Sequence, residues 1–252
     1  MSSAFAWQAG LLAVIGMLAG FINVLAGGGS LLTLPALIFL GLPAATANGT
    51  NRIAILSQNI FAASSFRRHG VLSIRLALLC TIPALIGSYF GANLAITIVE
   101  QLFQRLLAVI MIGVLVFNTL DPMKRWRHTD LNLTRWRIAT LLLCFFVIGV
   151  YGGFVQAGVG FLIISALLAQ GLDLVRINAI KVFVVGVFTL VALAVFIEHG
   201  QVNFGLGLAL AAGNSIGGII ATRMAINKGH DWIKNIVSLT ILCFAIKLLL
   251  GV

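Results

Sequence analysis

Apolar segments long enough to cross a lipid bilayer follow one another along almost the whole chain, and this pattern constrains the fold more than any other feature. A helix needs about 20 such residues to cross the hydrocarbon core. Only 9% of the 252 residues are charged, against about 25% in a typical soluble domain, so lipid is the expected solvent. We predict an all-α integral membrane protein with eight segments, near residues 8–41, 44–66, 74–96, 101–119, 138–170, 174–197, 203–222 and 232–251.

The eight segments divide into two similar units of four, joined by a basic linker. Four pairs of positions share one offset: Gly41 with Gly171, Asn48 with Asn178, His69 with His199, and Gly87 with Gly217. Self-similarity at a fixed offset indicates an internal repeat. We therefore divide the chain into a first repeat over residues 1–120, a linker over 121–137, and a second repeat over 138–252.

The first segment of each unit is too long for one straight span, and glycines interrupt it. The interruptions are Ala26-Gly27-Gly28-Gly29-Ser30 and Ala157-Gly158-Val159-Gly160. Each glycine costs about 1 kcal/mol relative to alanine inside a helix, so we predict a break at both places. Broken membrane helices at corresponding positions of two repeats are typical of a transporter binding site.

Two buried cations are predicted beside these breaks. Arg52 lies inside the second segment, and Lys181 lies at nearly the same place in the second unit. Half-helices that begin near Ser30 and Phe161 would add free N–H groups and the positive ends of two helix dipoles. We predict that these groups together bind an anion near the axis that relates the two units.

Uncharged polar residues cluster around the same two places, where their side chains could donate hydrogen bonds to an oxyanion. The predicted substrate-binding set is Arg52, Lys181, Asn48, Asn178, Asn51, Asn23, Gln156, Gly28, Gly29, Ser30 and Gly160. Thr46 and Thr50 flank the first site. Ser57, Gln58 and Asn59 form a second polar patch that we expect to line the path.

The acidic residues number only six, and all of them lie at segment ends or in loops. Cation pumps usually carry a carboxylate at mid-membrane depth, so this distribution favours an anionic substrate and leaves proton coupling without an obvious carrier. The three cysteines show no metal-binding spacing, and we expect no metal or cofactor. No pattern of catalytic residues indicates an enzyme.

The basic residues, which give a net charge of +10, sit in short runs between apolar segments. Such runs are typical of cytoplasmic loops rather than of nucleic-acid binding. The loop near Arg67 and the linker are then both cytoplasmic, which implies an even number of crossings per unit, parallel repeats and both termini in the cytoplasm. If the broken segments are re-entrant hairpins, this number of crossings changes. Arg223, Lys228 and Lys234 are exceptions on the other side.

Small residues at a spacing of four predict close helix packing in the third segment of each unit. The pairs are Gly87 with Gly91 and Gly213 with Gly217. The His69-Gly70 and His199-Gly200 pairs predict helix C-terminal caps.

The run from Gly20 to Ser30, together with Pro35 and the stretch Ala47-Asn48-Gly49-Thr50-Asn51-Arg52, resembles the TauE/SafE sulfite exporter family of membrane transporters, also called TSUP or DUF81. The stretch Asn178-Ala179-Ile180-Lys181-Val182 is similar to that family's second half. The resemblance implies a multi-pass protein of the bacterial inner membrane that carries sulfite, thiosulfate or organosulfonates such as sulfoacetate. The second break departs from the first, because it lacks a triple glycine and a nearby proline.

The leading hypothesis is a secondary transporter that moves a small anion by alternating access, with one unit rocking against the other. An anion channel and a membrane assembly protein without a substrate stay open as alternatives. The oligomeric state does not follow from the sequence.

Overall fold

The computed structural model describes residues 3–119 and 134–250, and these two ranges contain helices and connecting turns but no strand. The all-α class is therefore confirmed, whereas residues 121–133 of the predicted linker lie outside the described residues. The helices are α1 (Ser3–Leu25), α2 (Ser30–Phe39), α3 (Ala44–Arg68), α4 (Ile74–Thr97), α5 (Glu100–Thr119), α6 (Arg135–Phe154), α7 (Val159–Leu168), α8 (Leu174–Glu198) and α9 (Phe204–Leu250).

Within these two ranges, five helices are long and apolar enough to cross a membrane: α1, α4, α6, α8 and the part of α9 that ends at Gly229. At Gly229 the backbone leaves helical geometry with a φ of 75°, which divides α9 into two arms. The helix α3 has 25 residues but carries buried polar side chains. By contrast, α2 and α7 have 10 residues each and are about 15 Å long, too short to span a bilayer.

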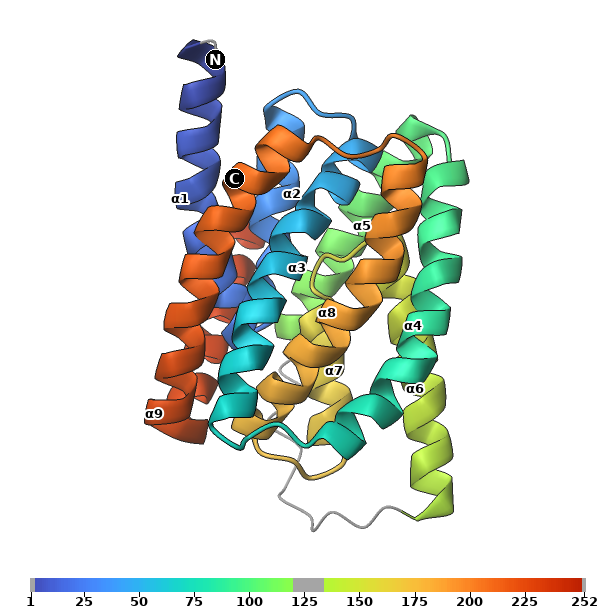
Figure 1. The fold of residues 1–252 in the computed structure, drawn as a ribbon, viewed down its shortest axis with the longest axis vertical. Helices are drawn as coiled ribbons and strands as arrows, with labels where there is room; N and C mark the ends of the chain where they lie inside the picture. The colour runs from blue at the N-terminus through green and yellow to red at the C-terminus, as the bar shows by residue number, and fades with distance from the viewer. Residues whose placement is uncertain (1–2, 120–133, 251–252) are drawn as a thin grey trace.

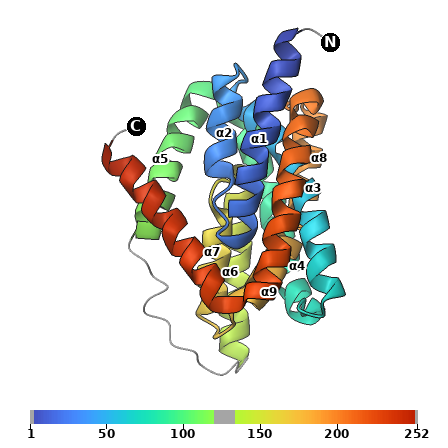
Figure 2. The same ribbon diagram turned by 90° about the vertical axis from the view of Figure 1, so that its left-hand side faces the viewer.

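The first predicted segment of each unit is a helical hairpin. Figure 1 shows α1 running inward from the upper end of the molecule and α2 returning to that end, while α6 and α7 make the same excursion from the lower end. Figure 2 shows both hairpins from the side, where they meet in the middle of the molecule. The order of a long helix, a short helix and two long helices therefore recurs in α1–α4 and α6–α9.

Because each hairpin returns to its own side, only three further helical arms cross the molecule in each unit. The chain enters α1 at the upper end, α5 runs from the upper end toward the lower half, and α6 begins at the lower end (Figures 1 and 2). The two recurring groups begin at opposite ends of the molecule in Figure 1, which differs from the parallel arrangement that we expected from the basic loops. The physical reason is that a short helix returns along its partner instead of crossing the bilayer.

The two His-Gly turns illustrate the inversion. His69 caps α3 and His199 caps α8, and each is followed by a glycine with a φ near +70°. In each turn the Nδ1 of histidine lies 2.8 Å from a carbonyl oxygen one helical turn earlier. The capping prediction is confirmed, but the two caps lie at opposite ends of the molecule (Figure 1).

Glycines let helices of different units pack backbone to backbone. A Cβ atom built at Gly213 or Gly217 of α9 would lie 1.9 Å from a carbonyl oxygen of α1. A Cβ atom built at Gly87 or Gly91 of α4 would lie 1.9–2.2 Å from a carbonyl oxygen of α6. The packing role predicted for these motifs is confirmed, and each unit packs its first helix against the third long helix of the other unit.

Candidate binding site at the helix breaks

The two helix breaks cross each other at the centre of the molecule. A Cβ atom built at Gly27 would lie 2.3 Å from the Cα of Gly160, and a Cβ atom built at Gly160 would lie equally close to Gly27. Gly27 and Gly158 also have φ angles of 87° and 71°, which favour glycine. The glycines therefore serve both the reversal of each hairpin and the contact between the two hairpins.

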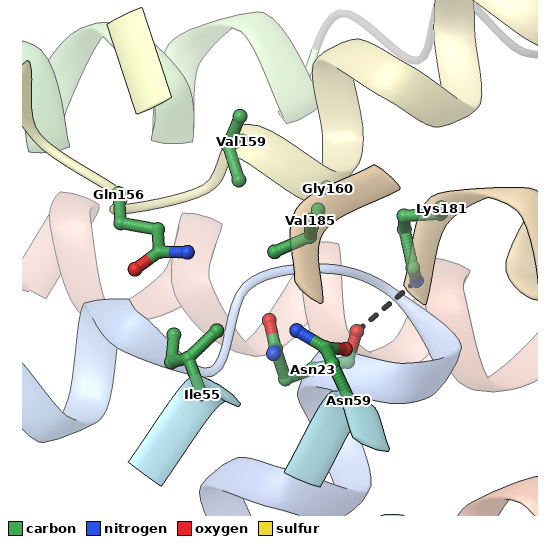
Figure 3. A pocket seen from close by; sticks show the side chains of 8 residues that line it. All are labelled: Asn23, Ile55, Asn59, Gln156, Val159, Gly160, Lys181 and Val185. Carbon is green, nitrogen blue, oxygen red and sulfur yellow. Dashed lines mark hydrogen bonds between the residues drawn. The ribbon is translucent and has the colours of Figure 1, made fainter. Parts of the chain in front are cut away.

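A small cavity of about 10 Å³, with room for about one water-sized sphere, lies beside this crossing. Its wall is formed by Asn23, Ile55, Asn59, Gln156, Val159, Gly160, Lys181 and Val185 (Figure 3). Ile55 and Val185 are equivalent positions of the predicted repeats, since they follow Asn48 and Asn178 by the same interval. The cavity thus lies where the two units meet, between α3 and α8.

Lys181 supplies the positive charge of the cavity wall. Its Nζ donates to the carbonyl oxygens of Asn23 and Val24 at 3.1 and 2.7 Å, and to Oδ1 of Asn178 at 2.8 Å. The two carbonyls belong to the last turn of α1, where the helix dipole is negative. Lys181 therefore caps the broken helix of the other unit while its ammonium group stays beside the cavity (Figure 3).

Arg52 makes the corresponding contacts in the other half but does not line the cavity. Its guanidinium donates to the carbonyl oxygens of Gly152 and Gly153 at 3.1 and 2.5 Å, in the last turn of α6. The guanidinium carbon also lies 4.7 Å from the ring centre of Phe196. The side chain is fully buried, and its Nε finds no hydrogen-bond partner within the described residues.

Amide side chains complete the polar part of the cavity. Nδ2 of Asn23 donates to Oε1 of Gln58 at 3.3 Å, and Nε2 of Gln156 donates to Oγ1 of Thr189 at 2.5 Å. Within the described part of the chain, Nδ2 of Asn59, Nε2 of Gln58 and Oε1 of Gln156 are buried and find no hydrogen-bond partner. Unpaired buried polar atoms are rare, and a bound ligand is one way to pair them.

The remaining predicted residues lie away from the cavity wall. Asn48 donates to the carbonyl oxygen of Phe154 at 2.8 Å. Asn178 accepts a hydrogen bond from the ammonium group of Lys181 but does not line the cavity. Asn51 binds Thr33 and Ser30 within the first unit. Gly28, Gly29 and Ser30 begin α2 but do not line the cavity.

The structure thus places Lys181, Asn23, Gln156 and Gly160 at the cavity, and it separates the rest of the predicted set from it. Sequence reasoning missed the apolar wall of Ile55, Val159 and Val185, because aliphatic residues carry no distinguishing signal in so apolar a chain. Asn59 belongs to the patch that we expected along the path, and its place in the wall agrees with that expectation.

Positive charge is not balanced by any buried acid in the described residues. Among the residues whose exposure the structure describes, the buried charged side chains are Arg52 and Lys181, and both are basic. These residues also contain no group of histidines, cysteines and carboxylates that could hold a metal ion. The ammonium group of Lys181 is thus the positive group of the cavity wall, and its three N–H groups are donated to protein acceptors.

Comparison with known proteins identifies the family. The family described as "Sulfite exporter TauE/SafE" matches residues 12–248. A "Probable membrane transporter protein" of Haemophilus influenzae is 26% identical over 90% of this chain and 89% of its own length. "Probable membrane transporter protein YfcA" of Escherichia coli is 27% identical over 95% and 89%, and "Probable membrane transporter protein ORF9" of a Sinorhizobium species is 28% identical over 94% and 90%.

No solved structure matches the chain significantly. The family match covers nearly the whole chain, and the relatives share the same extent, so the resemblance seen in the sequence is confirmed. The chain belongs to the TauE/SafE family of membrane transporters and is a multi-pass membrane protein.

Proposed function

We propose that the protein is a secondary transporter for a small anion of the sulfur oxyanion or organosulfonate class. The observation that carries this proposal is the cavity at the crossing of the two hairpins, with the ammonium group of Lys181 in its wall. Broken helices that surround a buried site are the arrangement expected of a carrier. The sulfur chemistry rests on the family description alone.

In alternating access, we expect the groups of helices that move together to differ from the two repeats. Since α1 packs on α9 and α4 packs on α6 through glycines, rocking of whole units would separate both tight contacts. We propose instead that α1–α3 move with α9 and that α6–α8 move with α4. The two bodies meet where α3 crosses α8 and where the two hairpins touch at Gly27 and Gly160. The cavity lies at that contact, where such a motion would open it to either side.

The proposed bodies can be tested by cross-linking pairs of introduced cysteines. A link between Ile55→Cys and Val185→Cys, across α3 and α8, should arrest transport. A link between α1 and α9, for example Met17→Cys with Ile216→Cys next to the contact of Met17 with Gly217, should leave transport intact. Arrest by both links, or by the second alone, would contradict these bodies.

The protein also has a proposed orientation in the bacterial inner membrane. The ends of helices at the lower end of Figure 1 carry most of the basic residues: Arg67, Arg68, Arg75, Arg135, Arg137, Arg176, Arg223 and Lys228. By the positive-inside rule this end faces the cytoplasm. In this inverted arrangement Arg223 and Lys228, which were exceptions to the rule in the parallel arrangement, lie on the cytoplasmic side. The start of α1 and the end of α9 lie on the opposite, periplasmic side.

Orientation can be checked with reporter fusions. Alkaline phosphatase, which is active only outside the cytoplasm, should be active when fused to the C-terminus and inactive when fused within residues 121–133. The reverse pattern would contradict the proposed orientation but not the inverted fold.

Transport itself is best tested by binding first and uptake second. The detergent-purified protein should unfold at a higher temperature in the presence of sulfite, thiosulfate or sulfoacetate than in chloride. Proteoliposomes should then show saturable uptake and counterflow of the same anion, because counterflow distinguishes a carrier from a channel.

The matched variants for this test are Lys181→Met and Lys228→Met. Lys181 lines the cavity, whereas Lys228 is exposed near the lower end of α9. We expect the first variant to lose the anion-dependent shift and the second to keep it. A folded protein that responds to no anion in the panel would overturn the proposed function.

A further inference from the structure

We propose that an anion in the cavity accepts the hydrogen bonds that the ammonium group of Lys181 donates to the last turn of α1, and that this uncapping loosens the contact between the two hairpins. The inference rests on the proposed function, and it links binding of the anion to the movement of the two bodies. It follows from the hydrogen bonds of Lys181, the size of the cavity and the place of the hairpin crossing.

The ammonium group of Lys181 has no N–H group left for a ligand in this structure. It can donate three hydrogen bonds, and these go to the carbonyl oxygens of Asn23 and Val24 and to Oδ1 of Asn178. The cavity beside it has room for about one water-sized sphere, which is too little for an oxyanion. The structure is therefore a closed form, and an anion that binds Lys181 must displace at least one of these acceptors.

The last carbonyls of α1 depend on Lys181 for a donor. The backbone N–H groups of Ala26 and Gly27 both donate to the carbonyl oxygen of Ile22. The next two carbonyls along the chain, which begin at Asn23, accept from Lys181 instead, and Figure 3 shows the bond to Asn23. A lysine at this negative end of the helix dipole stabilises the last turn, so its withdrawal would weaken that turn.

The weakened turn leads directly into the crossing of the two hairpins. Gly27 follows Val24 by three residues, and a Cβ atom built at Gly27 would lie 2.3 Å from the Cα of Gly160. Gly160 also lines the cavity. Movement of the end of α1 away from Gly160 would therefore enlarge the cavity and separate the two bodies at the same contact.

Arg52 does not offer the same switch in the other half. Its guanidinium caps the last turn of α6 through the carbonyls of Gly152 and Gly153, but it does not line the cavity. An anion in the cavity therefore contacts one cap and not the other. The end of α1 is released, while the end of α6 stays held.

Hydrogen–deuterium exchange of the full-length protein in detergent tests the switch. The added ligand is whichever of sulfite, thiosulfate and sulfoacetate raises the unfolding temperature most, and chloride is the reference. A ligand that only binds slows exchange at its site. Here the amides of residues 22–30 should exchange about tenfold faster with the anion, because the last turn of α1 opens more often without its cap. Residues 150–157, at the end of α6, should keep their rate.

Two variants separate the caps from the ligand. In Lys181→Met, residues 22–30 should exchange about tenfold faster without any anion and should not respond to one. In Arg52→Met, residues 150–157 should exchange faster without an anion, while residues 22–30 should still respond to it. The matched control is Lys228→Met, since Lys228 is exposed near the lower end of α9. It should behave as the wild-type protein does.

Slower or unchanged exchange of residues 22–30, in a protein that the anion stabilises, would overturn the switch and leave the proposed transport of anions intact. Unchanged exchange of the same residues in anion-free Lys181→Met would also overturn it, because the ammonium group would then not cap α1. Absence of a thermal shift with all three anions would refute the proposed function itself.

Discussion

Arg52 and Lys181 hold the ends of two broken helices, but their surroundings differ. Each donates to carbonyl oxygens in the last turn of the first helix of the other unit, where a cation offsets the negative end of the helix dipole. Arg52 fills its place with two carbonyls and the ring of Phe196, whereas Lys181 borders the cavity and is supported by Asn178. The comparison teaches that one structural task is done twice, and that only one copy is left beside space for a ligand.

The largest expected effect is that of Arg52→Ala on stability. The change leaves the carbonyls of Gly152 and Gly153 buried without a donor, at about 1–3 kcal/mol each, and adds a cavity. We expect a loss of about 3–5 kcal/mol in the free energy of unfolding. Thermal unfolding in detergent measures it, with exposed Arg75→Ala as the control. A fully stable but inactive Arg52→Ala protein would restore the direct binding role that the sequence suggested.

Gly160→Ala tests the crossing that both halves share. The added methyl group would lie 2.3 Å from the Cα of Gly27, so the two hairpins must move apart. We expect a destabilisation of about 1–3 kcal/mol, as for other overpacked sites, together with weaker anion binding. Gly10→Ala is the matched control, since nothing lies within 4 Å of a Cβ atom built there. A neutral Gly160→Ala would show that the hairpins do not touch as described.

Lys181→Met separates binding from capping. An anion at about 100 times its dissociation constant stabilises the wild-type protein by about 2.7 kcal/mol, and this increment should vanish in the variant. The same titration of Arg52→Met should retain most of the increment, because Arg52 does not line the cavity. Equal losses in both variants would mean that the two halves contribute alike to the site.

The smallest expected effects distinguish the two supporting asparagines. Asn178→Ala removes a partner of the Lys181 ammonium group, and Asn48→Ala removes a donor to the carbonyl of Phe154. Each should cost about 1–2 kcal/mol of stability. Asn178→Ala should in addition weaken anion binding several-fold, whereas Asn48→Ala should not. Identical binding by the two variants would remove the asymmetry between the halves.

Much of this architecture could be predicted from the residues. The predicted apolar segments are helical where they are described, the glycine motifs mark tight packing, and the His-Gly pairs cap α3 and α8. These features are local or periodic, so they can be predicted directly from the sequence. The number of membrane crossings could not be predicted from local sequence. A hairpin of two helices and a single bent span have the same apolar composition, and only the fold distinguishes them.

The place of the candidate site beside the helix breaks could be predicted, but the residues that line the cavity could be predicted only in part. Of the polar residues that we predicted beside each break, Lys181, Asn23 and Gln156 line the cavity, whereas Arg52 and Asn48 bind carbonyls of α6. From the sequence a buried cation near a break serves equally well as a ligand or as a helix cap. The choice depends on which carbonyls lie within reach, and those carbonyls come from the other unit.

The sequence by itself determined that this protein is a helical membrane protein with few acidic residues, and it predicted two related units with helix breaks at glycines. Hydropathy and residue type decide the first two properties, and they do not depend on how the helices are arranged. The tertiary structure alone decided that each short helix returns along its long neighbour, and that Lys181 rather than Arg52 lines the cavity. Backbone contacts between distant helices decide these properties. The sequence does not show which helix will contact a given carbonyl oxygen or glycine.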